Sequence, residues 1–267
     1  MRALLLRCLP PAALTLALLA GWETYVRVTD VPATILPSPS RILDAGVTEA
    51  DLLSWNAQQT LAETVLGFLL AVVVAVVCAA VIDFFPLVRR ALFPLLIASQ
   101  TIPMIALAPL LVLWFGFGMM PKVLVVALVC FFPMVVAAVH GLAATDPEAI
   151  KLYRTFGSSR WQIFRLVRLP TALPSFFAGT RIAVTYSVIG AVFAEYVGAS
   201  RGLGILLQTA KNSYRTDLVF AMIITTAALS LTLYGLVVVI ERLAIPWSRF
   251  AAADRQWQDA GRRDHSP

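Results

Sequence analysis

Apolar runs of around 20 residues recur along this 267-residue chain, and they constrain its fold more than any other feature. A helix of about 20 apolar residues is long enough to cross the roughly 30 Å hydrocarbon layer of a bilayer. Backbone groups in lipid have no water to bond, so such runs are expected to be helices. Charged residues make up only 13% of the chain, against about 25% in soluble domains. The sequence therefore predicts an all-α membrane protein.

We predict six transmembrane helices. The first lies within residues 1–28, where no A-x-A cleavage pattern follows the apolar core, and this argues against a secretory signal peptide. The other five cover about 60–82, 91–116, 122–142, 175–198 and 218–240. The second of the six opens on Thr60 to Glu63, which matches a capping box and would account for the position of Glu63.

The chain divides into four predicted parts: a first transmembrane helix (1–28), a periplasmic segment (29–56), a transmembrane core (57–245) and a cytoplasmic tail (246–267). With the N-terminus inside, the inner segments hold more than twice as many Lys and Arg residues as the outer ones. This asymmetry agrees with the rule that positive charge is retained on the cytoplasmic side. Both termini are therefore predicted to be cytoplasmic.

The third apolar run, about 91–116, is unusual because three prolines interrupt it and Gln100 and Thr101 lie near its middle. Prolines free backbone carbonyls, which in a membrane is tolerated only against protein or a wet cavity. Gln100 and Thr101 are therefore candidates for contact with a transported substrate. Hydrogen bonding to neighbouring helices would explain them equally well.

Small residues recur every four positions in two of the runs, beginning at Gly67 and at Gly179, and each stripe lies on one helix face. Such stripes allow helices to approach closely in lipid. One more step along the second stripe leads to Glu195. Carboxylates within a membrane are costly and usually face a bundle interior or a wet cavity. We hypothesise that Glu195 lines the outer gate or the substrate path.

One segment of the core, residues 143–174, interrupts the apolar pattern with five basic and two acidic side chains. We call it the basic loop. Its pattern predicts two short amphipathic helices at about 147–156 and 159–168, joined at Gly157 and stopped by Leu169-Pro170. The charge asymmetry places it in the cytoplasm, where a polar helix–turn–helix is suited to bind a soluble partner. Alternatively, it lies on anionic lipid headgroups.

Several function classes are disfavoured. The sequence contains no G-x-x-x-x-G-K-[ST], G-x-S-x-G or H-E-x-x-H motif, so neither ATP binding in a phosphate loop nor hydrolase chemistry is expected. The two histidines are far apart, and Cys8, Cys78 and Cys130 lie in apolar surroundings without metal-ligand spacing. The net charge of +6 comes from residues that flank the spans, which argues against nucleic-acid binding.

The basic loop resembles the cytoplasmic loop of bacterial ABC importer permeases, whose pattern is E-A-A-x3-G-x9-I-x-L-P. Gly157 matches the glycine, Leu169-Pro170 lies at the required spacing, and Val167 stands at the isoleucine position. The sequence departs from the pattern at its front, where Lys151-Leu152-Tyr153 replaces E-A-A and Glu148 lies only nearby. This departure bears on the contact that the family's glutamate makes.

Three further segments extend the resemblance over most of residues 36–245. They are Leu36 to Ser40, Gln100 to Gly116, and Glu195 with Gly198 to Gly204. These segments are similar to the nitrate/sulfonate/taurine branch of the permeases. Within that branch the Gln100 to Gly116 segment is most similar to permeases for thiamine-precursor pyrimidines or riboflavin.

The resemblance implies a type I ABC importer permease fold with six transmembrane helices and a cytoplasmic coupling helix–turn–helix. It implies that the chain is a permease subunit, not an enzyme, that moves a small organic solute into the cytoplasm by alternating access. A thiamine-precursor pyrimidine or related heterocycle is the expected substrate. A sulfonate, taurine or nitrate is the alternative, and an ATP-independent secondary transporter is the alternative from another class.

The resemblance also implies partners and a location. Two permease copies would form the pore as a homodimer in the lipid of the bacterial inner membrane. A cytoplasmic ABC ATPase under each copy would hold ATP and Mg, and this chain would hold no cofactor. A periplasmic or extracellular solute-binding protein would deliver the solute.

By the same resemblance, the basic loop would dock on the ATPase. The residues expected to couple to the ATPase are Glu148, Lys151, Phe156, Gly157, Trp161, Leu169 and Pro170. Phe156, Trp161 and Phe164 would be its apolar anchors, surrounded by Arg154, Arg160 and Arg165. Aromatic and arginine side chains commonly dominate such contacts.

Overall fold

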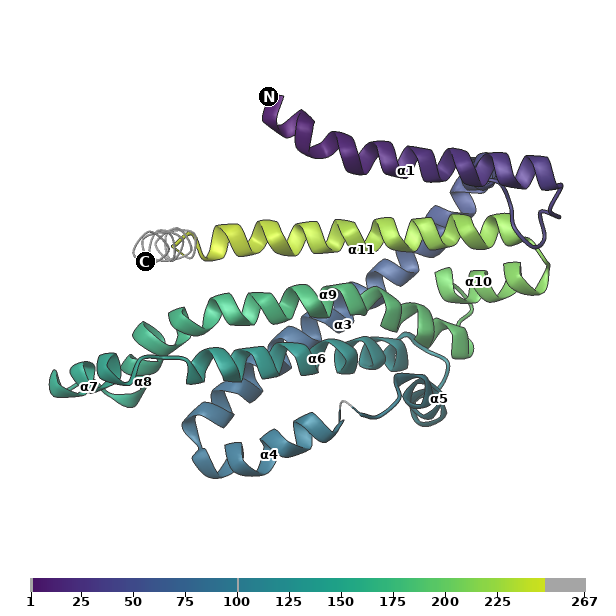
Figure 1. Ribbon diagram of the computed structural model, residues 1–267. Coiled ribbons are helices and arrows are strands. Elements are labelled where there is room, and N and C mark those ends of the chain that lie inside the picture. Colours follow the sequence, from purple (N-terminus) through teal and green to yellow (C-terminus); the bar gives the residue numbers. More distant parts are fainter. Residues whose placement is uncertain (1, 100, 248–267) are drawn as a thin grey trace. The chain divides into compact units, whose positions relative to one another are not determined.

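A computed structural model describes residues 2–99 and 101–247 (Figure 1). The side chains of residues 2–8, 12, 104 and 105 are outside that description. Every regular element within the described ranges is a helix, in agreement with the predicted all-α class. Contacts divide the chain into two units, Met1–Ala62 with Val192–Leu229, and Glu63–Ala191 with Ser230–Pro267. Three long helices, α3, α9 and α11, each contribute to both units.

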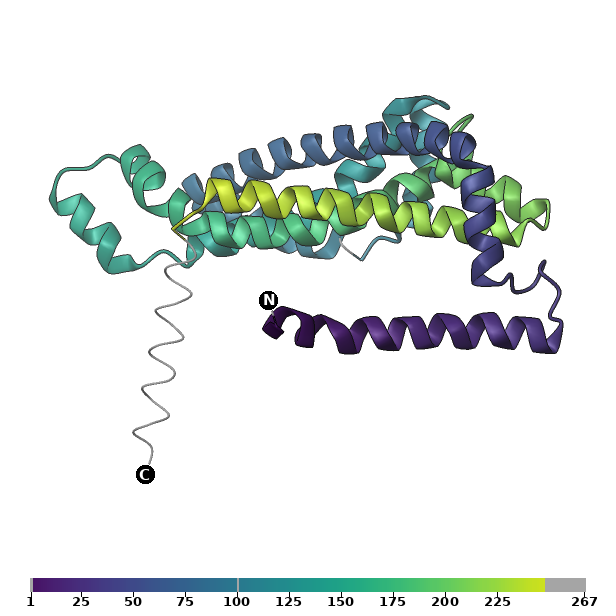
Figure 2. The same ribbon diagram turned by 90° about the horizontal axis from the view of Figure 1, so that it is seen from above.

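The first unit begins with α1 (Arg2–Thr29), which runs as one helix through Pro10 and Pro11 (Figure 2). It continues with α2 (Pro39–Thr48) and the first part of α3 (Ala50–Phe84), which meet at a sharp bend. The end of α9 (Leu169–Gly198), α10 (Leu203–Asn212) and the first part of α11 (Thr216–Ala244) complete the unit. Its small core includes Ile42, Leu53, Leu218 and Met222.

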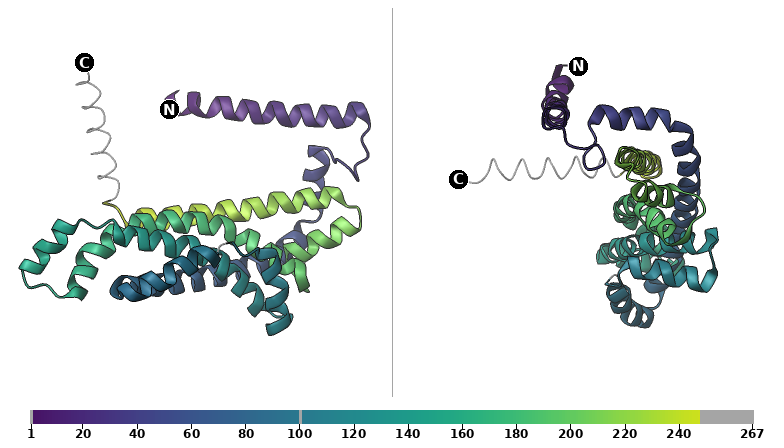
Figure 3. Two further views of the ribbon diagram at one scale, coloured as in Figure 1. Left: turned by 60° about the horizontal axis from the view of Figure 1, so that its bottom comes forward. Right: turned by 90° about the vertical axis from the view of Figure 1, so that its right-hand side faces the viewer.

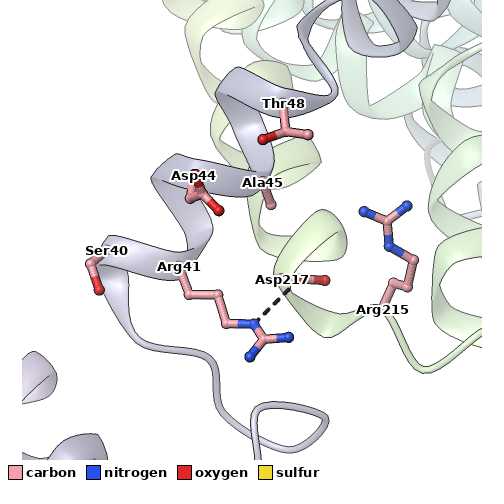
Figure 4. Close-up of a pocket in the computed structure, with 7 residues that line it drawn as sticks. All are labelled: Ser40, Arg41, Asp44, Ala45, Thr48, Arg215 and Asp217. Carbon is pink, nitrogen blue, oxygen red and sulfur yellow. Dashed lines mark hydrogen bonds and ion pairs between the residues drawn. The ribbon is translucent and has the colours of Figure 1, made fainter.

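Two ion pairs hold the α2 end of this unit to the start of α11. Arg41 Nε lies 3.5 Å from an Asp217 carboxylate oxygen, beside an open hollow of about 480 Å³ (Figure 4). Arg215 lies 2.8 Å from Glu49, which caps the end of α2. Because both arginines have carboxylate partners, the charges beside the hollow are largely balanced within the unit.

The second unit contains most of α3 and α9 and the end of α11. Between α3 and α9 the chain forms α4 (Pro86–Ser99), α5 (Met104–Phe115), α6 (Met119–Ala143), α7 (Pro147–Thr155), α8 (Arg160–Ile163) and a π-helical turn (Phe164–Arg168). The C-terminal ends of α3 and α6 lie at the same end of this unit as the basic loop (Figure 1).

The small-residue stripes are packing faces of α3 and α9. Ala71, Ala75 and Ala79 are almost completely buried on α3, as are Ala183 and Ala191 on α9. The glycines that begin the stripes allow an approach closer than any side chain permits. A Cβ atom at Gly67 would lie 2.5 Å from the Cβ of Val126 on α6, and one at Gly179 would lie 2.5 Å from the Cβ of Ala137. The sequence pattern correctly identified these faces.

Four of the described helical stretches are long and apolar enough to span a bilayer: Ala50–Phe84, Met119–Ala143, Arg160–Gly198 and Thr216–Ala244. They contain four of the predicted runs. Because α3 begins at Ala50, Thr60 is inside the helix and is not an N-cap. The capping-box interpretation of Thr60 and Glu63 is therefore wrong.

The predicted third span is not one continuous helix. Residues 91–116 are divided between α4 and α5, and Pro103 stands at the N-cap of α5. A proline has no N–H to donate into a helix, so it is well suited to the start of a helix, where that N–H would have no partner within the helix. The break falls beside Gln100, which itself lies outside the described residues.

We predict that Gly67→Ala lowers the thermal unfolding midpoint of the detergent-purified protein. The added methyl would meet the backbone oxygen of Val123 at 2.7 Å as well as Val126, and overpacking of this kind costs about 1–3 kcal/mol. Gly235→Ala is the matched control, because a Cβ on that α11 glycine has no atom within 4 Å. Equal midpoints for the two variants would contradict the close packing of α3 on α6.

Candidate functional site

The basic loop forms the two short helices that its pattern predicts. Residues Pro147–Thr155 are α7, and Arg160–Ile163 together with the π-helical turn cover the second predicted helix. The two lie side by side at the end of the second unit (Figures 1 and 3). The Asp146 side chain caps α7 by accepting from the Glu148 N–H at 2.8 Å. Ser159 and Gln162 form a capping box at the start of α8.

Gly157 makes the turn between these helices. Its φ of 76° is in the left-handed region, which glycine adopts without steric cost. The Gly157 N–H donates to the Arg154 carbonyl at 2.9 Å, and the Ser158 N–H donates to the Tyr153 carbonyl at 3.1 Å. These two bonds form a Schellman motif, which pairs the last free carbonyls of α7. The glycine of the sequence pattern is therefore required by the backbone of the turn.

Leu169-Pro170 does not stop the second helix as predicted. The chain passes from the π-helical turn directly into α9, which begins at Leu169. In a regular α-helix the proline ring would clash with the carbonyl four residues earlier. A π-helical turn displaces that carbonyl by pairing residues five apart, and the Leu169 N–H bonds to the Phe164 carbonyl. Leu169 is partly exposed and Pro170 is half-buried within this continuous helix.

The three predicted aromatic anchors have different surroundings. Phe156 is 78% exposed at the end of α7, whereas Phe164 is only 8% exposed. Trp161 is 60% exposed and stacks on Phe164 and on Phe84, with ring centroids 5.6 and 6.1 Å apart. Phe164 therefore belongs to the packing beneath the loop, which corrects its assignment as an anchor. Phe156 and one face of Trp161 remain available for a partner.

Most charged side chains of the loop are exposed: Glu148, Lys151, Arg154, Arg160 and Arg165. Arg154 and Arg160 line a hollow of about 230 Å³ beneath the loop, together with Arg168 and Asp83. Arg168 donates to the Asp83 carboxylate at 2.6 Å, which joins the start of α9 to the end of α3. The predicted ring of Arg154, Arg160 and Arg165 around the aromatic anchors stays a prediction.

Glu195 lies in the first unit, fully buried, and binds the start of α10. Its carboxylate accepts from the Gly204 N–H at 2.6 Å and from the Thr60 hydroxyl at 2.7 Å. The Thr60 oxygen in turn accepts from the Leu203 N–H at 2.9 Å. The first N–H groups of a helix have no partner within the helix itself. Here α3 and α9 supply those partners to α10.

Gly202 completes this arrangement, which we call the Glu195 network. Its N–H donates to the Asn56 side-chain oxygen at 2.9 Å. Its φ of 135° favours glycine, and a Cβ there would overlap the Glu195 carboxyl group. The negative carboxylate also lies at the positive end of the α10 dipole, a favourable placement. The glycine-rich segment beside Glu195 is thus explained by how closely its backbone approaches the carboxylate.

The structure gives the candidate substrate-path residues separate surroundings. The Glu195 carboxylate binds the Gly204 N–H and the Thr60 hydroxyl, as described above. Thr101 is exposed, and its hydroxyl donates to the Ala98 carbonyl of the preceding turn at 2.7 Å. Gln100 lies outside the described residues. A role for these residues in the substrate path remains a prediction.

Sequence reasoning missed a buried ion pair in the second unit. Lys122 Nζ lies 3.0 Å from a Glu63 carboxylate oxygen, and the two side chains are 6% and 0% exposed. Lys122 is the first residue of the run predicted at about 122–142, and it lies in the first turn of α6. Buried charges of this kind are stable when paired. A lysine at the very start of an apolar run was the available signal, yet nothing in the spacing pointed to Glu63.

Residues 63–245 match the family described as binding-protein-dependent transport system inner membrane component. The chain belongs to this family. The match includes the whole basic loop and the candidate spans other than the start of α3. The chain is therefore a transport permease subunit of the ABC importer type, as the resemblance of its loop and flanking segments implied.

Three curated relatives cover most of the chain. The formylaminopyrimidine transport permease ThiX of Halalkalibacterium halodurans is 35% identical over 91% of this chain and 97% of its own length. The riboflavin transport system permease RibX of Chloroflexus aurantiacus is 38% identical over 86% and 87%. The taurine transport system permease TauC of Escherichia coli is 31% identical over 86% of each chain. These relatives confirm the predicted branch.

A solved structure supports the fold. One chain of the MetNI methionine ABC transporter, solved in inward-facing conformations, matches 74% of this chain and 97% of its own length. The TM-score is 0.61 at 20% sequence identity. The likeness therefore shows that the two chains share a fold.

We predict that Glu195→Ala lowers the thermal unfolding midpoint of the permease in detergent. The Gly204 N–H would lose its buried acceptor, which costs about 1–3 kcal/mol. Glu195→Gln is the matched variant, because its amide oxygen still serves Gly204, and it should lower the midpoint less. If alanine proves as stabilising as glutamate, the network does not hold the start of α10.

Proposed function

We propose that this permease works as one half of a pore, driven by a cytoplasmic ATPase that docks on the basic loop. The main support is the family match over residues 63–245, because it covers the loop and the spans that flank it as one unit. ATP and Mg would be held by the ATPase, and the second half of the pore would be another copy of this chain. The family favours this function over an ATP-independent secondary transporter.

The proposed membrane arrangement has six crossings, with both termini in the cytoplasm of a bacterium. Four crossings are the long apolar helices, and α1 and the α4–α5 pair would supply the other two. The α4–α5 break is compatible with a membrane position because irregular backbone is tolerated when protein or a cavity covers it. Positive charge on the loop side supports the orientation.

Docking of the loop would rest on side chains that point away from the unit beneath it. Phe156 and the free face of Trp161 are exposed aromatic surfaces, and the turn at Gly157 lies between them in the chain. Leu169 and Pro170 would contribute through the π-helical turn that fixes the direction of α8 relative to α9. Exposed Glu148 and Lys151 on α7 would meet the rim of the ATPase groove.

We predict that Phe156→Asp weakens binding of the ATPase to the permease at least about tenfold, as is usual for a buried aromatic anchor. Phe117→Asp is the control, because Phe117 is also 78% exposed but lies beyond the opposite end of α6. Binding is measured by titrating purified ATPase onto the permease in detergent. An unchanged affinity for Phe156→Asp, or an equal loss for both variants, would exclude this docking surface.

The substrate path is proposed to pass Gln100, Thr101 and Glu195. The interrupted segment between α4 and α5 supports the first two, and the position of Glu195 near the outer end of α9 supports the third. The Glu195→Gln variant separates a path role from a structural one, since it keeps the acceptor for Gly204. Normal uptake by reconstituted, stably folded Glu195→Gln would remove Glu195 from the path.

For the substrate, we propose a thiamine-precursor pyrimidine or a related heterocycle, with a sulfonate or taurine as the alternative. The support is the identity to the formylaminopyrimidine and riboflavin permeases, which exceeds that to the taurine permease. A solute-binding protein encoded beside this permease would select the compound before delivery.

We expect that binding protein to bind a pyrimidine or flavin in calorimetric titrations and to stimulate the ATPase of the reconstituted importer when loaded. Taurine and an alkanesulfonate serve as the comparison ligands in the same titrations. Tight binding of either, with no heat from the heterocycles, would reverse the substrate assignment while leaving the importer function in place.

A further inference from the structure

The hollow beneath the basic loop has a strongly unequal charge. We call it the basic pocket. Its volume is about 230 Å³, and its charged side chains are Arg154, Arg160, Arg168 and Asp83. Asp83 is already bound by Arg168 at 2.6 Å. Among the described residues, neither Arg154 nor Arg160 has an ion-pair partner. Two guanidinium groups thus line the pocket without a negative counterpart.

A second observation concerns Arg168, which lines the same pocket. The Nε atom of Arg168 is buried and has no hydrogen-bond partner among the described atoms, although the same guanidinium binds Asp83 through Nη1. Buried N–H donors in proteins are nearly always paired, and an orphan donor calls for an explanation. Arginine donors fit the oxygens of a phosphate group particularly well.

The position of the pocket indicates where such a phosphate would come from. Phe84, the last residue of the Ala50–Phe84 candidate span, lines it, so the pocket lies where the apolar part of α3 ends. In a bilayer this is the level of the lipid headgroups. The remaining wall is apolar and includes Ile150 and Phe164. Basic pockets at the cytoplasmic ends of membrane helices are suited to anionic lipid headgroups.

We propose that the basic pocket binds the phosphate of an anionic phospholipid. The phosphate accepts from Arg154, Arg160 and the Nε of Arg168, and the glycerol part of the lipid lies against the apolar wall. This contact joins α7 and α8 to the end of α3 through a lipid. The lipid thereby stabilises the basic loop, and the outer surface of the loop stays exposed. The proposal goes beyond the importer function and does not depend on the identity of the substrate.

The test measures lipid binding to the full-length permease, purified with its ATPase in detergent. Phosphatidylglycerol and phosphatidylcholine are titrated separately, and bound lipid is counted by native mass spectrometry. We expect clear preference for phosphatidylglycerol, reduced about tenfold or more in the Arg154→Gln/Arg160→Gln double variant. The control double variant Arg90→Gln/Arg165→Gln removes the same charge from exposed positions outside the pocket and should keep the preference. The two single pocket variants should each show part of the loss.

Four results would overturn the proposal. Equal binding of the two lipids by the wild-type protein would exclude headgroup selection. Equal loss in both double variants would indicate general attraction to surface charge. Displacement of phosphatidylglycerol by millimolar inorganic phosphate would assign the pocket to a free anion. Loss of ATPase binding with unchanged lipid preference in the pocket double variant would assign the arginines to an acidic side chain of the ATPase.

Discussion

The structure depends on one constraint. Polar groups buried inside this apolar protein have almost no water to bond, so they must pair with other groups of the protein. The start of α10 illustrates it most fully. Three successive backbone N–H groups there are bound by Asn56, Thr60 and Glu195, which come from α3 and α9. A carboxylate is costly in an apolar setting unless its oxygens accept several hydrogen bonds. Glu195 satisfies both requirements at once, because the helix end needs acceptors and the carboxylate needs donors.

The same requirement operates in the second unit. Lys122 and Glu63 neutralise one another between α6 and α3, and Arg168 binds Asp83 where α9 begins. The π-helical turn before Pro170 belongs to the same set of solutions, because it lets the chain continue as a helix through a residue without an N–H. The two ion pairs each join segments that are distant in sequence. In this apolar protein, polar side chains therefore join particular helices. The small-residue faces determine how closely the packed helices approach one another.

Local features of the structure were predictable from the sequence, whereas partner choices between helices were not. The two helices of the basic loop, the turn at Gly157 and the stripes from Gly67 and Gly179 follow from residue patterns within a few turns, where helical periodicity relates sequence to position. The pairing of Glu63 with Lys122 joins residues 59 positions apart. A pattern of spacing has no information about such a contact. The misread Thr60 shows the same limit, since a capping box is only a local match and the helix began ten residues earlier.

The altered front of the loop motif follows from the same distinction between backbone and side chain. Where the family pattern has E-A-A, this chain has Lys151-Leu152-Tyr153, and α7 still forms. The Schellman turn needs only the carbonyl of Tyr153, which any residue provides, and the left-handed conformation of Gly157. The side chains of Lys151 and Leu152 are exposed on α7. The substitution therefore leaves the shape of the basic loop intact and changes its surface from acidic to basic. If an ATPase docks on this loop as proposed, we expect its groove to be correspondingly more acidic at that position.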